Sequence, residues 1–446
     1  MKITLVNLPV SIPTVMPYSL AMMKAVLEHE TLEKATSLDL NAWYHYKKFN
    51  EFYERKKKED YFSLLDEFVN KTRLSYQKLS KDSLLGNKLE MHDDLLREIL
   101  ATSPDVVAIS FIYNSQAFFA KGIIDELIKR KIKVIIGGPG DFYRVKGEAI
   151  VLQDYSSLVK YLTEIGANAK KDNKSNKKIA LDFSDFKKEE YFTKEIIYSI
   201  RTATSCPYKR CTFCTHHGNK PYSMMELSFV KESIIKNKME KICFIDDCFT
   251  IPRLNELALM LEPLKVKWWC QLRATSGTVN ILPKLKKAGL QSVAWGIESG
   301  SQRVLDFMEK GTTVSKTEQV LKKAKELGII NMVYIMFGLP TETKEELTET
   351  IAYLKRNKEN IYLVSTSTFG LQQGSRIFSM PDVFGVKEII QKERTMFGNK
   401  ISYSPKSGLT QDEAETLKNR YKGEISHMNK VPKAINACKE QILNYC

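Results

Sequence analysis

Continuous apolar runs separated by stretches of helical composition most constrain the fold of this chain. One run covers 105–112 (Asp-Val-Val-Ala-Ile-Ser-Phe-Ile), and another covers 134–140 (Val-Ile-Ile-Gly-Gly-Pro-Gly). A strand that is apolar on both faces is typical of a parallel sheet covered by helices on both sides. A helix is predicted between the two runs, at about 115–129. This pattern predicts a doubly wound α/β domain, whose ligands bind at the carboxyl edge of the strands.

The same domain is predicted to begin with a short strand at 3–8, which Pro9 ends, and a helix at about 19–28. Residues 44–100 are rich in Lys and Glu with apolar residues at helical spacing, and we expect helices there.

A second strand–helix series is predicted after an exposed linker, because residues 166–178 lack apolar periodicity. The candidate strands lie at 196–202, 241–245, 266–272, 292–296, 332–337 and 362–368. Helical stretches separate them at 226–237, 254–264, 279–288, 301–309, 316–326 and 344–355. Such a series predicts a barrel with its site at the carboxyl ends of the strands. The segment is short for eight units, so a partial (β/α)6 barrel of the TIM type fits better.

We therefore expect an α/β chain with a Rossmann-like domain at 1–165, a linker at 166–190 and the partial barrel at 191–385. A helical C-terminal region is expected at 386–446. No internal repeat is found.

Lys and Arg number 68 against 53 Asp and Glu, a formal charge of +15. The basic residues are interleaved with acidic ones, as where Arg55-Lys56-Lys57-Lys58 is followed by Glu59-Asp60. No basic stripe alternates with aromatics as a single-stranded nucleic acid groove requires, so nucleic acid is not an expected partner. The surplus remains a weak indication of an anionic electron donor or substrate.

The chain contains eight Cys. Residues 1–9 lack the apolar run of a secretory signal, and no run of about 18 apolar residues predicts a membrane span. We therefore expect a cytoplasmic protein with reduced thiols, in which clustered Cys serve metal binding or catalysis. Cys206, Cys211 and Cys214 are clustered, whereas the other five are scattered.

The three clustered Cys follow the first barrel strand directly, so they can converge on one centre. Three thiolates do not close a tetrahedral zinc site, which takes four ligands. A [4Fe–4S] cluster held by three Cys leaves one iron open for chemistry. Zinc stays the alternative, since His216 or His217 could supply a fourth ligand.

The Cys segment resembles the cluster loop of radical S-adenosylmethionine (SAM) enzymes. Their most common spacing is three residues and then two, whereas this chain has four and then two. The four-residue variant resembles a branch that carries an N-terminal cobalamin-binding-type domain. The lead-in 181–186 (Leu-Asp-Phe-Ser-Asp-Phe) is also similar to that branch.

Further segments resemble the family motifs in the expected order. Asp246 and Asp247 end the second barrel strand, where the resemblance implies contacts to the SAM amino group. Arg273 follows the third strand and is placed to meet the SAM carboxylate, because its planar fork suits bidentate pairing. The alternatives are a loop or helix cap for the two Asp and a barrel salt bridge for Arg273.

The segment 295–301 (Trp-Gly-Ile-Glu-Ser-Gly-Ser) resembles the fourth-strand motif, which implies that Glu298 faces SAM polar groups with Ser299 nearby. Its continuation to Lys310-Gly311 also matches. Gly338 belongs to a segment similar to the fifth-strand motif, where the backbone approaches the adenine. Phe213 is expected against the adenine, with a core position as the alternative.

The N-terminal domain resembles a cobalamin-binding fold, with Gly137 and Gly138 expected at the cofactor. It lacks the Asp-x-His-x-x-Gly segment that supplies a lower axial histidine, and none of its histidines has that context; these are His29, His45 and His92. Either cobalamin binds without a protein histidine, or the fold remains and the cofactor is lost.

The resemblance implies a [4Fe–4S] enzyme that reductively cleaves SAM to a 5′-deoxyadenosyl radical and modifies an unactivated carbon. Cobalamin-dependent C-methylation of a peptide, lipid or other natural product is the leading expectation, with epimerisation, ring closure or carbon–carbon bond formation as other outcomes. An external flavodoxin- or ferredoxin-type electron donor is implied. The alternatives are a cobalamin-free enzyme that modifies tRNA, such as a methylthiotransferase, and a non-catalytic zinc-binding protein.

Overall fold

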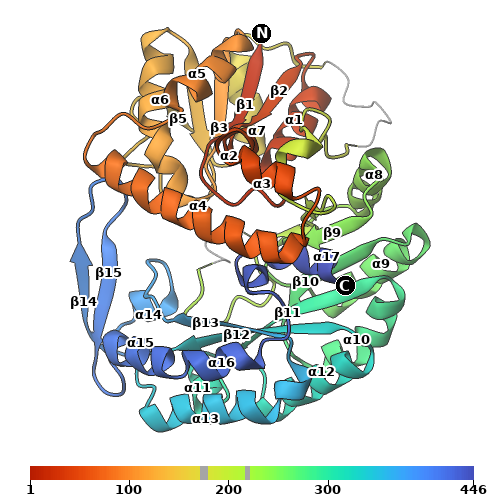
Figure 1. Ribbon diagram of the computed structural model, residues 1–446, viewed down its shortest axis with the longest axis vertical. Helices are drawn as coiled ribbons and strands as arrows, with labels where there is room; N and C mark the ends of the chain where they lie inside the picture. The colour runs from red at the N-terminus through yellow and green to blue at the C-terminus, as the bar shows by residue number, and fades with distance from the viewer. Residues whose placement is uncertain (171–178, 216–220) are drawn as a thin grey trace. The chain divides into compact units, whose positions relative to one another are not determined.

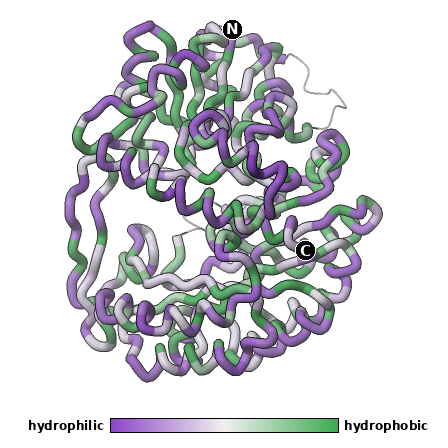
Figure 2. Tube along the Cα trace, viewed as in Figure 1, coloured by the Kyte–Doolittle hydropathy of each residue, from purple (hydrophilic) through white to green (hydrophobic). Residues whose placement is uncertain are grey.

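The computed structural model describes residues 1–170, 179–215 and 221–446, and the chain divides into two compact units. Unit 1 comprises Met1–Ser199, Ser228–Met239 and Glu393–Gly398, and unit 2 comprises Ile200–Leu227, Glu240–Lys392 and Asn399–Cys446. Figure 1 shows the elements of each unit, and in Figure 2 apolar segments follow the strands while the helices alternate between apolar and hydrophilic segments.

Unit 1 contains a five-stranded sheet with the order β2-β1-β3-β4-β5, in which every neighbouring pair is parallel. The strands are β1 (Ile3–Asn7), β2 (Ala35–Asp39), β3 (Val106–Ser110), β4 (Lys133–Gly137) and β5 (Ile150–Val151). The chain leaves β1 for β2 on one side and returns to β3 on the other, so a topological switch point lies between β1 and β3. This arrangement confirms the predicted Rossmann-like domain.

Helices connect these strands as the helical composition predicted. The connecting helices are α1 (Tyr18–Glu30), α2 (Leu40–Lys48), α3 (Asn50–Arg55), α4 (Tyr61–Leu84), α5 (His92–Ala101) and α6 (Ala117–Lys129). Helix α7 (Tyr155–Glu164) follows β5. Helix α8 (Leu227–Asn237), predicted at 226–237 among the barrel helices, belongs almost entirely to unit 1, which includes Ser228–Met239. Strand β2 was not predicted from the sequence. It lies at the sheet edge and reads Ala-Thr-Ser-Leu-Asp, with alternating rather than continuous burial, so it lacks the apolar run that marks β1 and β3.

Unit 2 is built on an open sheet with the order β13-β12-β11-β10-β9-β6. The strands are β6 (Tyr198–Ile200), β9 (Lys241–Phe244), β10 (Lys267–Leu272), β11 (Leu290–Glu298), β12 (Ile330–Phe337) and β13 (Leu363–Thr368). Strands β9 to β13 pair in parallel with their chain neighbours. The covering helices are α9 (Ile251–Leu261), α10 (Ser276–Lys287), α11 (Gln302–Phe307), α12 (Val314–Glu326) and α13 (Lys344–Arg356). The predicted partial barrel is confirmed.

The expected helical region after residue 385 is wrong in its first part. Strands β14 (Val386–Lys392) and β15 (Lys400–Pro405) form an antiparallel hairpin. Charged side chains at several positions of these strands conceal their period-two pattern. The helices α15 (Gln411–Arg420), α16 (Lys422–Met428) and α17 (Ile442–Tyr445) follow. The remaining short elements are α14 (Arg376–Ser379) and the pair β7 (Ala203–Thr204) and β8 (Ser223–Met224).

The predicted linker at 166–190 is only partly a linker, and the second unit begins at Ile200 rather than at 191. Leu181, Tyr191 and Phe192 are buried in unit 1. The Phe192 ring stacks on Phe68 with centroids 4.0 Å apart, and the Tyr191 hydroxyl donates to Asp39 at 2.6 Å. These contacts join nonadjacent segments, so the local composition could not reveal them. Residues 171–178 lie outside the described part.

Candidate functional site

The three clustered Cys lie between β7 and β8, after the strand β6 that opens unit 2. All three are half-buried, and they are not linked by disulfides. Ser205 and Lys209 have left-handed backbone conformations, with φ of 64° and 52°, which turn the loop tightly around the first thiol. Thr212 fixes the middle of the loop, because its N–H donates to the Met308 carbonyl at 3.0 Å.

Cys206 is surrounded by hydrogen-bond donors. The Cys248 thiol and the backbone N–H groups of Lys209 and Tyr208 interact with the Cys206 sulfur and lower the pKa of Cys206. The Cys248 thiol also donates to the Phe249 carbonyl at 3.7 Å. Burial instead raises the pKa of Cys211. The thiolate is the form that binds metals, so the loop favours the ligating form at its first Cys.

Cys248 was counted among the scattered cysteines, and the structure places it in the site. It follows Asp246 and Asp247 after β9, and its contact with Cys206 joins residues far apart in sequence. Within the described ranges, no three His, Cys, Asp or Glu side chains gather as a single metal ion requires. His216 and His217, the proposed fourth zinc ligands, lie outside those ranges.

The two adjacent aspartates after β9 have different surroundings. Asp246 is buried and accepts hydrogen bonds from the backbone N–H groups of Thr202 and Ala203, at 3.0 and 2.7 Å, and from the Thr202 hydroxyl at 2.8 Å. Burial raises its pKa to about 6 despite these donors. Asp246 therefore fastens β9 to the residues after β6. Asp247 is half-buried and is the better placed of the two for a ligand.

Arg273, after β10, forms no salt bridge with any described residue, in contrast to the barrel salt bridge considered from the sequence. Its guanidinium stacks on the Tyr208 ring at 3.3 Å from the centroid, and Nη2 donates to the Lys310 carbonyl at 2.6 Å. Its Nε is buried without a hydrogen-bond partner among the described residues. Arg273 thus joins the Cys loop to the segment around Lys310 and retains unused donor capacity.

Glu298 ends β11 in a left-handed conformation with φ of 69°, beside a register shift between β11 and β12. Its carboxylate accepts from Lys310 Nζ at 2.7 Å. Burial is the largest influence on the pKa of Lys310 and would lower it, but the charge of Glu298, the charge of Cys211 and the hydrogen bond to Glu298 together outweigh burial, so the pKa is raised. Lys310 Nζ also lies 5.6 Å from the centroid of Phe213, within the Cys loop. Lys310 belongs to this site, although the sequence analysis identified it only as part of a motif.

Three other predicted residues have packing roles in the structure. Ser299 is buried and bonds the Thr350 hydroxyl at 3.0 Å. Phe213 is half-buried, and one side of it packs against an apolar cluster that includes Met308. Gly338 has φ of 78°, and a Cβ there would lie 2.5 Å from the Ala414 Cβ.

Glu342 is a buried carboxyl group four residues after Gly338. It accepts from the N–H groups of Gly338 and Leu339, while its Oε1 has no hydrogen-bond partner among the described residues. Burial raises its pKa to about 7. The carboxyl group therefore holds the loop after β12 in place from inside.

In unit 1, the glycine turn after β4 is filled by the domain's own backbone. A Cβ at Gly137 would lie 1.9 Å from the Leu152 carbonyl oxygen, and one at Gly138, where φ is 132°, would lie 2.2 Å from the Phe111 carbonyl oxygen. Both glycines are thus required for close packing at this edge, whatever ligand binds there.

A buried polar network also lies at the ends of β1 and β2. Asn7 donates to Asp39 at 2.8 Å, and Gln116 donates to Asn7 at 3.0 Å. The Tyr191 hydroxyl supplies a further donor to Asp39. These partners satisfy the carboxylate within unit 1.

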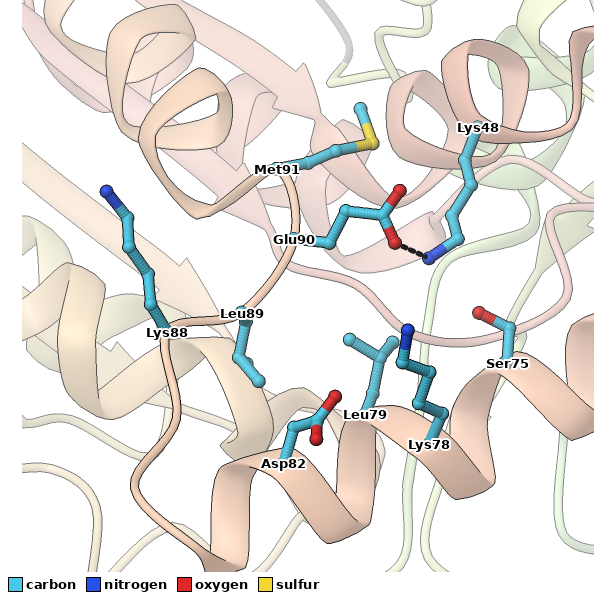
Figure 3. Close-up of a pocket in the computed structure, with 9 residues that line it drawn as sticks. All are labelled: Lys48, Ser75, Lys78, Leu79, Asp82, Lys88, Leu89, Glu90 and Met91. Carbon is cyan, nitrogen blue, oxygen red and sulfur yellow. Dashed lines mark hydrogen bonds and ion pairs between the residues drawn. The ribbon is translucent and has the colours of Figure 1, made fainter.

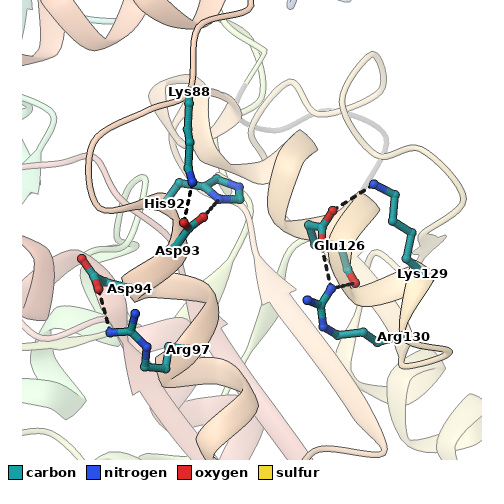
Figure 4. Close-up of polar contacts among 8 residues, drawn as sticks. All are labelled: Lys88, His92, Asp93, Asp94, Arg97, Glu126, Lys129 and Arg130. Carbon is teal, nitrogen blue, oxygen red and sulfur yellow. Dashed lines mark hydrogen bonds and ion pairs between the residues drawn. The ribbon is translucent and has the colours of Figure 1, made fainter.

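All three histidines of this domain lie on helices, at α1, α2 and α5. His45 is buried, bonds the Asn41 carbonyl at 2.7 Å and the Tyr76 hydroxyl at 2.5 Å, and burial lowers its pKa to about 3. His29 contacts Glu30, and His92 contacts Asp93 (Figure 4).

Two hollows of unit 1 lie along α4 and α5. One, of about 410 Å³, is lined by Lys48, Lys78 and Lys88 among others, and Lys48 is paired with Glu90 at 2.7 Å (Figure 3). The other, of about 1260 Å³, has a rim on which Lys88 pairs with Asp93 and Arg130 pairs with Glu126 (Figure 4). Neither is lined by the glycine turn.

Residues 200–354 match the family model described as Radical SAM superfamily. An uncharacterized methyltransferase of Pyrococcus horikoshii is 29% identical over 167 residues, 35% of this chain and 36% of that protein. An anaerobic magnesium-protoporphyrin IX monomethyl ester cyclase of Rubrivivax gelatinosus is 30% identical over 159 residues, 33% of this chain and 28% of that protein. The chain thus spans about a third of the length of these curated relatives.

Two solved structures share the fold over nearly the whole chain. The radical SAM methyltransferase TsrM of Kitasatospora setae, with tryptophan and a SAM analogue, matches with a TM-score of 0.61, 15% identity and coverage of 97% of this chain and 89% of that chain. The cobalamin-dependent SAM radical enzyme OxsB, with aqua-cobalamin, matches with a TM-score of 0.66, 16% identity and coverage of 95% and 67%. The predicted combination of a Rossmann-like cobalamin-type domain and a radical SAM barrel is confirmed as a fold.

No helix in the described part of the chain is long and apolar enough to cross a membrane.

Proposed function

The chain carries a radical SAM domain at residues 200–354, and from this premise we propose that it is a cobalamin-dependent radical SAM C-methyltransferase. Cys206, Cys211 and Cys214 hold a [4Fe–4S] cluster in unit 2, and unit 1 holds cobalamin. When bound, the cluster and SAM supply an electron and a 5′-deoxyadenosyl radical that takes hydrogen from an unactivated carbon, and cobalamin supplies the methyl group.

The Cys206 environment carries this proposal. Three half-buried Cys lie on one loop after the first strand of the sheet, and the Cys248 thiol with two backbone N–H groups lowers the pKa of the first of them, which favours its thiolate. Hydrogen bonds to sulfur ligands also set the potential of an iron–sulfur cluster. Three thiol ligands leave one iron open, which is the position that SAM would take.

Other residues of the same edge are assigned to SAM. Asp247 accepts a hydrogen bond from the SAM amino group. Arg273 stacks on Tyr208, and its Nε–H, which has no partner among the described residues, donates to the SAM carboxylate. Glu298 accepts from polar donors of SAM through the oxygen that Lys310 does not bond. Phe213 and the backbone at Gly338 border the adenine. Asp246 and Ser299 act through the loops that they fasten.

Cobalamin is proposed at the carboxyl edge of the unit 1 sheet, beside the switch point where doubly wound folds bind ligands. Gly137 and Gly138 shape that edge by allowing β4 to turn beside Phe111. The domain's histidines lie on helices and are engaged in contacts of their own, so a lower axial histidine is not part of the proposal.

The substrate is proposed to be a small molecule or peptide, with reduction by a flavodoxin- or ferredoxin-type protein. The relatives of this chain support methyl transfer, since they include an uncharacterized methyltransferase. They also include a hopanoid C-3 methylase of Methylococcus capsulatus that is 22% identical over 295 residues, 56% of this chain and 57% of that protein.

Anaerobic reconstitution with iron and sulfide tests the proposal. The wild type should take up about four iron per chain, as a [4Fe–4S] cluster requires, and produce 5′-deoxyadenosine from SAM under reduction. Cys211→Ala should abolish that product while the circular dichroism spectrum is retained, and Cys438→Ala is the matched control at a buried Cys of the C-terminal segment. Stoichiometric zinc without iron uptake would overturn the proposal.

Addition of hydroxocobalamin, followed by gel filtration and absorbance, tests unit 1 separately.

A further inference from the structure

Lys310 and Glu298 form a buried ion pair whose position depends on a missing side chain. Both are largely withdrawn from solvent, with side-chain exposures of 8% and 14%. A Cβ built on Gly296 would lie 2.8 Å from Lys310 Nζ and 2.9 Å from Glu298 Oε1. The pair therefore lies directly over Gly296, in the space that glycine leaves on β11.

Unusual backbone geometry flanks this pair on the Glu298 side, and two hydrogen bonds hold the backbone on the Lys310 side. Glu298 adopts a left-handed conformation that residues with a side chain disfavour, beside a register shift that re-aims the end of β11. On the other side, Arg273 Nη2 bonds the Lys310 carbonyl at 2.6 Å, and the Tyr208 hydroxyl bonds the Glu309 carbonyl at 2.8 Å. Two residues of the candidate site thus hold the segment that carries Lys310.

Only one of the two carboxylate oxygens of Glu298 accepts a hydrogen bond from a described residue. Lys310 Nζ bonds Oε1 at 2.7 Å, and no donor in the described ranges bonds Oε2. A buried ion pair gains little net stability from its own attraction because both charges lose water. A pair that fixes one oxygen and leaves the other available instead suits the orientation of a ligand-binding carboxylate.

We propose that Lys310 is a positioning residue of the SAM site: its ammonium holds the Glu298 carboxylate so that the remaining oxygen accepts from hydroxyl or ammonium donors of SAM. This inference rests on the proposed function. Lys310 also lies 5.6 Å from the Phe213 centroid, so the pair links the end of β11 to the Cys loop. Gly296 is required because a side chain there would displace both charged ends.

The test is the dissociation constant of SAM for the anaerobically reconstituted holoprotein, measured by equilibrium dialysis. Gly296→Ala moves the pair without removing a charge, and it should fold because the added Cβ meets only the ends of two flexible side chains. Lys310→Met removes the ammonium. Each should weaken SAM binding about tenfold, as expected for loss of one charge-assisted hydrogen bond. Gly423→Ala, whose Cβ would meet no atom within 4 Å, is the matched control and should bind as the wild type does.

A double-mutant cycle separates positioning from a purely structural role. If Lys310 acts through Glu298, the double variant Lys310→Met, Glu298→Gln should bind SAM with the same affinity as whichever single variant has the higher dissociation constant. Multiplying effects, or wild-type affinity in both Gly296→Ala and Lys310→Met, would overturn the inference. A wild-type holoprotein that binds no SAM would instead overturn the proposed function, and the inference with it. If Lys310→Met does not fold, the dissociation constant of SAM for Gly296→Ala alone tests the inference.

Discussion

Glycine follows or lies within a parallel strand at the functional edge of both units, but different atoms fill the space of its missing side chain. At Gly137 and Gly138 in unit 1, the nearest atoms are the backbone carbonyl oxygens of Leu152 and Phe111. At Gly296 in unit 2, they are the charged ends of Lys310 and Glu298. Backbone cannot move aside, whereas side-chain ends can. One set of glycines is therefore required by the fold, and the other by the site.

The largest change in the free energy of unfolding is expected on replacing a glycine whose missing side chain is opposed by backbone. Gly138→Ala combines a φ of 132° with a Cβ 2.2 Å from a backbone oxygen. We expect it to lower the free energy of unfolding by about 3 kcal/mol or more. Gly296→Ala should cost less than about 1 kcal/mol, since only flexible ends must shift. Urea unfolding followed by circular dichroism measures both, and equal losses would contradict the comparison.

Buried carboxyl groups extend the contrast. Asp39 in unit 1 has donors from Asn7 and Tyr191, whereas one oxygen of Glu342 in unit 2 has no partner among the described residues. Burial raises the pKa of Glu342 to about 7, so the native state binds more protons than the unfolded chain between about pH 4.3 and 7.

Stability should therefore fall as the pH rises through that window and stay level above it, with a total change from Glu342 of up to about 4 kcal/mol. Glu342→Gln should remove this slope. The measurement is urea unfolding at a series of pH values, in which an unchanged slope in the variant would assign the effect to other groups.

The third prediction concerns the Cys248 thiol, which has no counterpart in unit 1. Its interaction with the Cys206 sulfur is the largest cause that lowers the pKa of Cys206. In the metal-free protein, Cys248→Ala should raise the pKa of Cys206 by about one unit or more, since a donor to the thiolate is lost. The pH dependence of iodoacetamide labelling at Cys206, resolved by peptide mass spectrometry, measures this shift. Cys270→Ala, at a buried thiol outside the site, should leave the labelling profile unchanged.

The smallest effect is expected at Thr341, a β-branched residue with φ of 70°. Such a residue is strained in the left-handed region. Thr341→Gly should raise the free energy of unfolding by about 1 kcal/mol at most, because loss of the Arg303 bond to the Thr341 hydroxyl offsets part of the relief. Thermal unfolding measures the change, and a marked loss of stability would show that the Arg303 contact outweighs the strain.

The sequence predicted the strands of both sheets well where they are buried on both faces. The run 105–112 became β3, and the six barrel strands were placed within a few residues of their observed bounds. The edge strand β2 and the hairpin β14–β15 were missed, because half-exposed strands carry polar residues at alternate positions.

For the candidate site, motif order located the segments but not the direction of each side chain. Asp246 and Asp247 look equivalent in sequence, yet the carboxylate of Asp246 accepts its hydrogen bonds from Thr202 and Ala203 within the fold. Cys248 and Lys310 could not be ranked from sequence, since their partners Cys206 and Glu298 are brought to them only by the fold. Gly137 and Gly138 were identified as special, but their packing requirement depends on Phe111 and Leu152.

Electron paramagnetic resonance of the reduced, reconstituted protein, recorded before and after addition of SAM, tests whether the three-Cys loop holds a cluster that binds SAM. If Cys206, Cys211 and Cys214 hold a cluster with one open iron, the reduced protein should give a [4Fe–4S]⁺ signal whose g values shift when SAM binds that iron. A cluster signal that SAM leaves unchanged, or reconstituted protein without any such signal, would contradict the account.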